Sequence, residues 1–345
     1  MKKIVHVAVG VIFDCEPTDD GNILIAKRAD HQHQGGLWEF PGGKVEEGES
    51  ASQALQRELE EELGLQCELE DMTPLISIPF HYPDKSVLLD VWAVHNVIRF
   101  DKRIGKENQP LRWVEKADLK AYDFPAANKA IINALLLPKQ IAISQDHSDA
   151  DVILAQVATT LKNHHNVWLQ LRAPSLDQLQ YTQLAMKLYG ICHEAGSKLI
   201  WNCPLDWYQV AFADGLHLSR KNYADAKAHS NNIGQRPIPE HQWLSMACHN
   251  LAELEVAHDM ADYVLVSPVK ETSTHRQATP LTWSGFNVIS QQARIPCYAL
   301  GGMNISDITS AVQQGGQGIA AIRCFVDEPA AADENNAMKG KCYER

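Results

Sequence analysis

The sequence lacks closely paired cysteines, an excess of positive charge and a long apolar run. Its eight cysteines include no C-x-x-C pair, which favours reduced thiols over a disulfide framework or a zinc site. The net charge of -12 argues against a nucleic-acid polymer or an anionic membrane as partner. No apolar run approaches the ~18 residues of a membrane-spanning helix, since the longest candidate, 130–137, is interrupted by Asn133.

The length of the chain and its first residues limit the possible kinds of protein further. The amino terminus enters a strand-like pattern at once and shows no signal peptide, so we expect a soluble, cytoplasmic protein. A chain of 345 residues suggests two domains. It contains neither an internal repeat nor a dinucleotide-binding fingerprint.

One segment, residues 43–65, is far more specific than the rest. It fits the pattern G-x5-E-x7-R-E-U-x-E-E-x-G-U, where U is a bulky aliphatic residue. The nine specified positions are filled by Gly43, Glu49, Arg57, Glu58, Leu59, Glu61, Glu62, Gly64 and Leu65. Ser50 and Gln53 predict a capping box that starts a helix. We expect this helix to run to about Leu63 and to stop at Gly64.

The acids of this helix indicate a cation site. Glu58, Glu61 and Glu62 stand at i, i+3 and i+4, so an α-helix places their carboxylates on one face. Each like-charged pair costs about 0.2–0.5 kcal/mol without a counter-ion. Mg²⁺ takes oxygen ligands and leaves room for phosphate oxygens, so the trio predicts a magnesium site for a phosphate substrate.

A solvated acidic helix is the alternative explanation. It leaves unexplained the glycine-rich loop 41–44, which suits a close backbone approach to a metal or a phosphate. We also expect Glu49 to form an ion pair with Arg57, which would brace this loop against the helix.

The first 135 or so residues resemble the Nudix hydrolases, and within them the MutT-type 8-oxo-dGTP diphosphatases. Strand-like runs at 5–13 and 23–28 flank a turn at 20–21. The blocks LWEFPGGK, GKENQP and DFPAAN follow at 37–44, 105–110 and 123–128, in the family's order. The resemblance implies an α/β/α sandwich with a mixed sheet.

The resemblance also implies roles for individual residues. The catalytic residues would be Glu58, Glu61, Glu62 and Arg57, and Glu58 would orient or deprotonate the attacking water. Mg²⁺, with Mn²⁺ as an alternative, would be held by the carbonyl of Gly42 and by Glu58, Glu61, Glu62 and Glu107. The substrate would be contacted by Arg28, His33, Glu39, Phe40, Pro41, Gly42, Lys44, Lys85 and Asn128.

Several of these residues have a simpler interpretation. Arg28, His33 and Glu107 could be solvated surface residues, and Asn128 could cap the helix that follows it. We favour a base-reading role for Asn128 because its amide both donates and accepts hydrogen bonds. In 8-oxoguanine, N7 carries a proton that guanine lacks, and a site that accepts this proton can reject guanine by roughly 10⁴-fold.

By this resemblance the reaction converts 8-oxo-dGTP to 8-oxo-dGMP and pyrophosphate, which would keep the oxidised nucleotide out of DNA. Metal ions would neutralise phosphate charge while a carboxylate orients water. Two other functions remain open: a Nudix diphosphatase acting on thiamine-related diphosphates, and a second domain that binds a phosphorylated ligand and regulates the first.

The second half predicts a (β/α)₈ barrel. Pro138 should end a helix, so we place one domain at 1–137, another at 139–327 and a disordered tail at 328–345. Eight short apolar runs alternate with amphipathic stretches, as in a barrel, and a doubly wound sheet is the alternative. The runs are 140–144, 167–172, 198–202, 215–219, 244–248, 263–267, 297–300 and 318–323.

This half resembles thiamine-phosphate synthase and the related TenI group. The resemblance rests on LQLR at 169–172, DGLHL at 214–218, SPV at 267–269, LGG at 300–302 and GGQGIA at 315–320. Glycine-rich ends of late barrel strands commonly hold phosphate. A phosphorylated ligand could therefore lie at Ser273, Gly301 and Gly302.

The departures from that family are informative. Asn202-Cys203-Pro204 stands where the family has Asn-Asp-Arg, 219–222 offers no second acid, and Ala173-Pro174 replaces a lysine. Arg323 takes the place of a phosphate-side serine. With both metal carboxylates missing, we expect a barrel without synthase activity, which could also be an inert stabilising or oligomerising domain.

Overall fold

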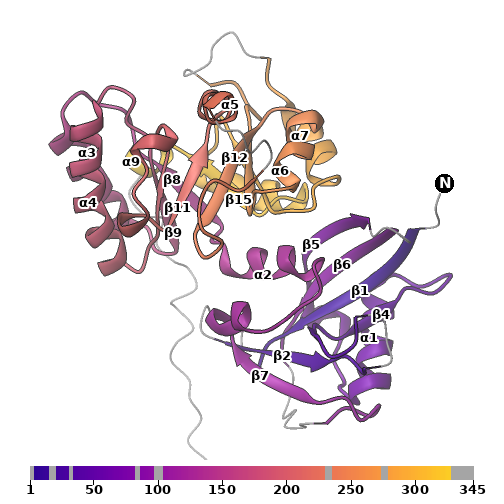
Figure 1. The fold of residues 1–345 in the computed structure, drawn as a ribbon. Coiled ribbons are helices and arrows are strands. Elements are labelled where there is room, and N and C mark those ends of the chain that lie inside the picture. Colours follow the sequence, from indigo (N-terminus) through magenta and orange to yellow (C-terminus); the bar gives the residue numbers. More distant parts are fainter. Residues whose placement is uncertain are drawn as a thin grey trace, which may run out of the picture.

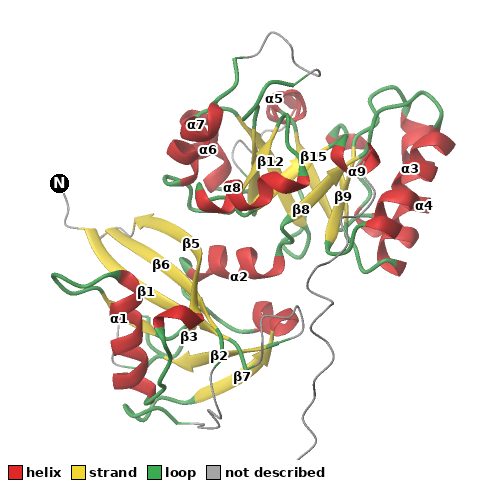
Figure 2. Ribbon diagram, turned by 180° about the vertical axis from the view of Figure 1, so that it is seen from behind, coloured by secondary structure: helices red, strands yellow, loops and turns green. Residues whose placement is uncertain are grey.

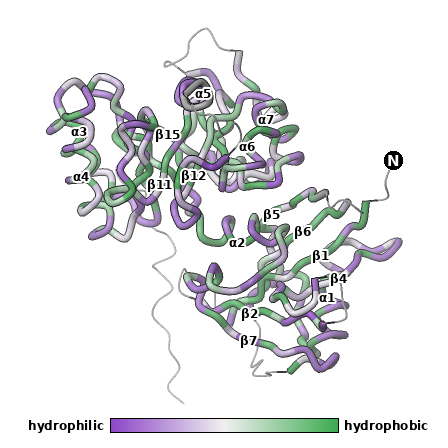
Figure 3. The backbone as a smooth tube through the Cα atoms, viewed as in Figure 1, coloured by the Kyte–Doolittle hydropathy of each residue, from purple (hydrophilic) through white to green (hydrophobic). Residues whose placement is uncertain are grey.

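A two-sheet domain lies beside a closed barrel, and helix α2 (Asn128–Leu136) lies between them (Figure 1). This computed structural model describes residues 4–14, 21–30, 34–81, 86–96, 104–229, 235–272 and 279–327. The predicted tail, 328–345, lies outside these residues. Figure 3 shows that hydrophobic residues follow the strands of both parts, where the cores lie.

The first domain contains two sheets. One has the order β4-β1-β6-β5, in which β1 runs parallel to β6 and antiparallel to β4, and the other has the order β3-β2-β7. The mixed sheet confirms the fold class that the sequence predicts. The strands are β1 (Ile4–Ile12), β2 (Asn22–Lys27), β3 (Trp38–Glu39), β4 (Gly42–Lys44), β5 (Met72–His81), β6 (Ser86–Val94) and β7 (Leu111–Glu115).

Alternation along β1 explains the layered arrangement. Ala8 and Ile12 pack in the core that includes α1 (Ala51–Glu58), whereas Val9 and Val11 pack in the core that includes α2. Successive side chains of a strand point to opposite faces, so one strand serves both helices. Short 3₁₀ turns at Leu69–Asp71 and Lys116–Ala121 complete the domain.

The acidic helix starts as predicted but ends differently. Ser50 and Gln53 form the capping box, and Gly64 ends the segment with a left-handed φ of 69°. However, the last five residues, Leu59–Leu63, form a π-helix instead of continuing the α-helix. A π-helix bonds i to i+5, so the side chains of this wider turn are rotated from their α-helical positions.

The second part is a closed barrel of eight parallel strands, in which β15 pairs with β8. All eight predicted strands are present within two residues of their expected ends, and closure shows that the alternative doubly wound sheet is wrong. The strands are β8 (Gln140–Ile143), β9 (Val167–Leu171), β10 (Leu199–Trp201), β11 (Gly215–Leu218), β12 (Trp243–Cys248), β13 (Tyr263–Val266), β14 (Cys297–Leu300) and β15 (Gly318–Ala321).

Helices surround the barrel (Figure 2). They are α3 (Ala150–Asn163), α4 (Gln178–Glu194), α5 (Arg220–His229), α6 (Leu251–His258), α7 (Thr282–Ser290), α8 (Ile308–Gln313) and α9 (Cys324–Asp327). The connection from β10 to β11 has 3₁₀ turns, Leu205–Trp207 and Val210–Phe212, where a repeat would place a helix, and another 3₁₀ turn, Ile305–Asp307, precedes α8. Among the described helices none has the length and apolar content that a membrane crossing requires.

Bulky side chains fill the barrel interior. Trp168, Trp243, Tyr263 and Tyr298 are buried in one cluster, and the Trp168 and Trp243 ring centroids lie 5.1 Å apart. The interior is therefore a packed core and not a pore. Six cysteines lie within the described residues, and each is buried as a thiol.

Candidate active site

Arg57 joins the glycine-rich loop to the acidic helix. Its Nη2 atom donates to the Glu49 carboxylate at 2.8 Å and to the Lys44 carbonyl at 3.1 Å. This confirms the predicted ion pair with Glu49. The hydrogen bond to Glu49 also raises the pKa of Arg57 further above its usual value, so the brace keeps its charge.

The same guanidinium holds two of the three acids. Its Nη1 atom donates to Glu58 at 2.9 Å and to Glu61 at 3.2 Å. Among the described residues, no three His, Cys, Asp or Glu side chains have the placement of a ready-made metal centre. Arg57 therefore compensates the charge of these acids, and a cation would have to draw them away from it.

Glu62 lies in a half-buried position where negative charge is not fully compensated. Burial, followed by the nearby carboxylates of Glu58, Glu107 and Glu39, raises the pKa of Glu62 to about 8, and Arg28 opposes this shift only in part. Three other carboxylates predicted to serve this site are thus close enough to Glu62 to disfavour its negative charge. Oxygen ligands that repel one another around a half-buried position fit a hard divalent cation such as Mg²⁺.

The glycine-rich loop lies directly against Glu58. Strand β4 pairs with β1, and a Cβ atom added to Gly43 would lie 2.1 Å from the carboxyl carbon of Glu58. A Cβ atom on Gly42, whose φ is 148°, would lie 2.2 Å from the carbonyl oxygen of Ala8. The position of Gly42 therefore requires glycine, because backbone lies against it, whereas a side chain at Gly43 would have to displace the Glu58 carboxylate. The metal-binding role of the Gly42 carbonyl stays a prediction.

The turn that carries Glu107 is fixed to the π-helix. The Lys106 N–H donates to the carbonyl of Glu62 at 2.7 Å, and Gln109 Nε2 donates to the same oxygen at 3.3 Å. Lys106 also forms an ion pair with Glu60 at 3.1 Å. We did not predict Lys106 and Gln109 as supporting residues, although both lie in the GKENQP block.

A wall of aromatic rings and the start of α2 carries the residues that we predict to contact the base. The rings of Phe40 and Phe124 stack at 5.3 Å, and the backbone N–H of Trp38 donates to the carbonyl of Asp123 at 2.8 Å. These contacts bring the DFPAAN block against the end of β3. Asn128, the first residue of α2, is only 8% exposed. The N-cap is Ala127 and no side chain caps it, so the alternative capping role of Asn128 is wrong.

Arg28 and Glu39 form an ion pair next to this wall. Burial raises the pKa of Glu39, and Arg28 partly offsets this effect. Pro41 is buried and its carbonyl accepts from Gly10 at 2.8 Å, whereas Lys44 is exposed at the end of β4. The predicted residues His33, Lys85 and Ser273 lie outside the described residues.

The barrel glycines have a packing role. Gly301 and Gly302 follow β14 with φ of 97° and 67°. An added Cβ would lie 2.9 Å from Pro268 at the first position and 2.5 Å from the Glu271 carbonyl oxygen at the second. Close packing against the loop after β13 thus accounts for both glycines, and a phosphate site there stays a prediction.

Glu62 should give the cation-free protein a distinctive pH dependence. Its pKa is about 8 in the folded chain, against an ordinary value of 4.5, so the folded state keeps a proton that the unfolded chain releases. Stability should therefore be greatest below pH 4.5 for this group and fall as the pH rises through 8. Melting temperatures in chelator at several pH values, with Glu62→Gln for comparison, measure this effect. An equal slope in both proteins would contradict it.

The two halves of the fold define a Nudix-type sandwich and a synthase-type barrel, and comparisons with known proteins agree. The family described as NUDIX domain matches residues 8–134, and the family described as Thiamine monophosphate synthase matches residues 140–325. The chain therefore belongs to the NUDIX domain family through its first part and to the thiamine monophosphate synthase family through its second.

Individual relatives divide in the same way. The chain is 37% identical over 136 residues to an 8-oxo-dGTP diphosphatase of Escherichia coli (strain K12). The aligned region covers 39% of this chain and 98% of that protein. A protein of the same description from Haemophilus influenzae is 39% identical over 138 residues, covering 39% of this chain and 93% of its own. A thiamine-phosphate synthase of Chloroflexus aurantiacus is 30% identical over 182 residues, covering 51% of this chain and 81% of its own.

Proposed function

We propose that the chain is an Mg²⁺-dependent 8-oxo-dGTP diphosphatase, which releases 8-oxo-dGMP and pyrophosphate and so limits mutation. The observation that supports it best is the group of carboxylates around Glu62, which lies beside a glycine-rich loop. The match to the E. coli diphosphatase over 98% of its length supports the choice of substrate.

The metal-binding residues would be Glu58, Glu61, Glu62 and Glu107, together with the Gly42 carbonyl. A bound Mg²⁺ (or Mn²⁺) would neutralise phosphate charge and stabilise the departing pyrophosphate. Glu58 lies against the loop at Gly43, where its carboxylate could orient the attacking water. Arg57 positions both Glu58 and the loop through its hydrogen bonds to Glu58 and the Lys44 carbonyl.

The remaining predicted residues divide between phosphates and base. Arg28 and Lys44 supply positive charge for the phosphates, with Glu39 orienting Arg28 through their ion pair. Phe40 and Pro41 form the apolar wall, where Phe40 is already stacked on Phe124. Asn128 offers a buried amide, which can pair with the modified edge of 8-oxoguanine. His33 and Lys85 are further proposed contacts of the nucleotide.

Substrate competition tests this function. We expect kcat/KM with Mg²⁺ to be highest for 8-oxo-dGTP in a panel that also contains dGTP, thiamine diphosphate and ADP-ribose. A preference for thiamine diphosphate would replace this proposal by the thiamine-related alternative.

We place the domains at 1–137 and 139–327 and infer a cytoplasmic location, in keeping with the buried thiols of the described residues.

The barrel is not proposed to act as a synthase. Its Asn202-Cys203-Pro204 segment lacks the aspartate that the family uses to bind metal. Cys203 is buried, and burial raises its pKa to about 12, so it stays a neutral thiol and is a poor metal ligand. A phosphorylated ligand near Ser273, Gly301 and Gly302, with a regulatory effect on the first domain, remains the second candidate role for the barrel.

A further inference from the structure

Helix α2 belongs to the cores of both domains. Ala130, Ile131 and Leu135 pack in the core of the first domain, and Leu136 packs against both cores. Leu137, just after the helix, belongs to the cluster that fills the barrel. Figures 1 and 2 both show the helix between the two bodies. A helix that is apolar nearly all round is buried on several sides, and this one connects the two domains.

The polar contacts of α2 with the barrel lie on one face. Lys129 and Asn133 are four residues apart, and Leu137 follows after four more. Lys129 Nζ lies 3.5 Å from the Glu240 carboxylate and 3.8 Å from that of Asp262. Asn133, only 2% exposed, donates to the Asp262 carbonyl at 3.4 Å. The residue that interrupts the apolar run in the sequence therefore faces the barrel.

The barrel also caps the C-terminal end of α2. Gln317 is 3% exposed, and its Nε2 atom donates to the carbonyls of Ala134 at 2.8 Å and Leu137 at 3.0 Å. Carbonyls in the last turn of a helix have no partner within the helix, so a buried donor from outside satisfies them. Tyr298 adds a hydrogen bond to the next carbonyl, that of Pro138, at 2.6 Å.

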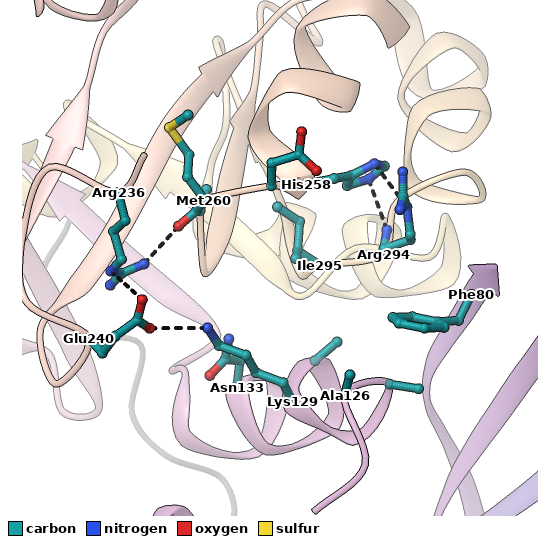
Figure 4. A pocket seen from close by; sticks show the side chains of 14 residues that line it. Phe80, Ala126, Lys129, Asn133, Arg236, Glu240, His258, Met260, Arg294 and Ile295 are labelled. Carbon is teal, nitrogen blue, oxygen red and sulfur yellow. Dashed lines mark hydrogen bonds and ion pairs between the residues drawn. The ribbon is translucent and has the colours of Figure 1, made fainter. Parts of the chain in front are cut away.

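The N-terminal half of the helix borders a cavity on the side of the barrel. A cavity of about 150 Å³ separates it from the barrel, lined by Ala126, Lys129 and Asn133 on one side and by Arg236 and Arg294 on the other (Figure 4). The neighbours of Asn128 thus border open space as well as packed side chains. Ala127 and Ile131 pack in the core of the first domain, whereas Asn133, Ala134 and Leu137 hold the helix to the barrel. Both sets of contacts together set where Asn128 lies.

We propose that Gln317, assisted by Asn133, is a positioning residue for Asn128, so that the barrel forms a structural part of base recognition. This inference rests on the proposed function, because it takes Asn128 as the residue that reads the base. Removal of the Gln317 donor leaves two buried carbonyls unpaired, which favours a shifted or frayed helix. Asn128 then loses its alignment, while the carboxylates near Glu62 keep theirs.

The test compares two barrel glutamines in the full chain. Gln317→Leu removes the contacts with α2. Gln242→Leu is the matched control, because Gln242 is 5% exposed and also donates to two carbonyls, those of Val210 and Ala213, within the barrel. We expect Gln317→Leu to raise KM for 8-oxo-dGTP and to lower its preference over dGTP by about 3–10-fold. Its kcat and Mg²⁺ dependence should stay unchanged, and the control should keep the wild-type preference.

Hydrogen exchange separates this inference from the proposed function. Backbone amides of residues 122–130 should exchange faster in Gln317→Leu than in the wild type or in Gln242→Leu, whichever nucleotide the enzyme prefers. Unchanged preference and exchange in a folded Gln317→Leu protein would overturn the inference, as would equal losses in both variants. If Gln317→Leu does not fold, Asn133→Ala, which removes the donor to Asp262, carries the same expectations.

Discussion

Glu58→Gln is expected to lower kcat by roughly 10²–10³, the loss typical when one electrostatic stabiliser of a transition state is removed. Glu58 is the acid that lies against the glycine-rich loop, bonds Arg57 and contributes to the raised pKa of Glu62. The glutamine keeps the shape of the side chain but loses the charge that binds a cation and orients water. The fold should survive, because the change is isosteric.

The neighbouring acid Glu60 provides the control. Its carboxylate pairs with Lys106, and it is not among the proposed ligands of the cation or contacts of the substrate. Steady-state kinetics should show little change in Glu60→Gln. An equal loss of kcat in the two variants would mean that any change of charge in this segment lowers activity, whichever acid is replaced. Full activity of Glu58→Gln would show that Glu58 takes no part in the mechanism.

Asn128→Ala is expected to reduce the preference for 8-oxo-dGTP over dGTP by on the order of 10- to 100-fold, because a site that pairs with a polar edge discriminates strongly against its absence. The amide is buried at the first residue of α2, and it makes no capping hydrogen bond to the helix. Loss of the side chain should therefore affect recognition more than the helix itself.

The measurement is kcat/KM for both nucleotides over a range of Mg²⁺ concentrations. Asn163→Ala, at the end of α3 in the barrel, is the control and should keep the wild-type ratio. The Mg²⁺ concentration for half-maximal rate should be the same in all three proteins. A wild-type ratio in Asn128→Ala would take this residue out of the base pocket.

The regular elements could be predicted from the sequence because their signals are local. The eight barrel strands are short apolar runs separated by amphipathic stretches, and each lies within two residues of its expected ends. The capping box at Ser50 and the left-handed stop at Gly64 also follow from local backbone chemistry. The acids that we propose to bind metal could be named in the same way, since Glu58, Glu61 and Glu62 stand at a characteristic spacing in one segment of the sequence.

The sequence does not show which of two helix types a segment adopts, or which of several nearby acids a basic side chain pairs with. Leu59 and Leu63 are buried whether their turn is α or π, so the apolar spacing does not distinguish the two. Arg57 could have paired with any of several acids, and only the tertiary structure shows that it contacts Glu49, Glu58 and Glu61 together. Only one feature of the sequence indicates that α2 is attached to the barrel, namely the polar residue Asn133 within an apolar run.

The central claim is that the acids of residues 58–62 bind a divalent cation beside the substrate's diphosphate. A crystal structure with Mn²⁺ and a nucleotide that resists hydrolysis tests it directly, because anomalous scattering locates the ion. We predict an ion between the nucleotide phosphates and the carboxylates of Glu58 and Glu62, with Glu58 released from Arg57. Phosphates bound elsewhere, with these acids still paired to Arg57 and no ion between them, would contradict the account.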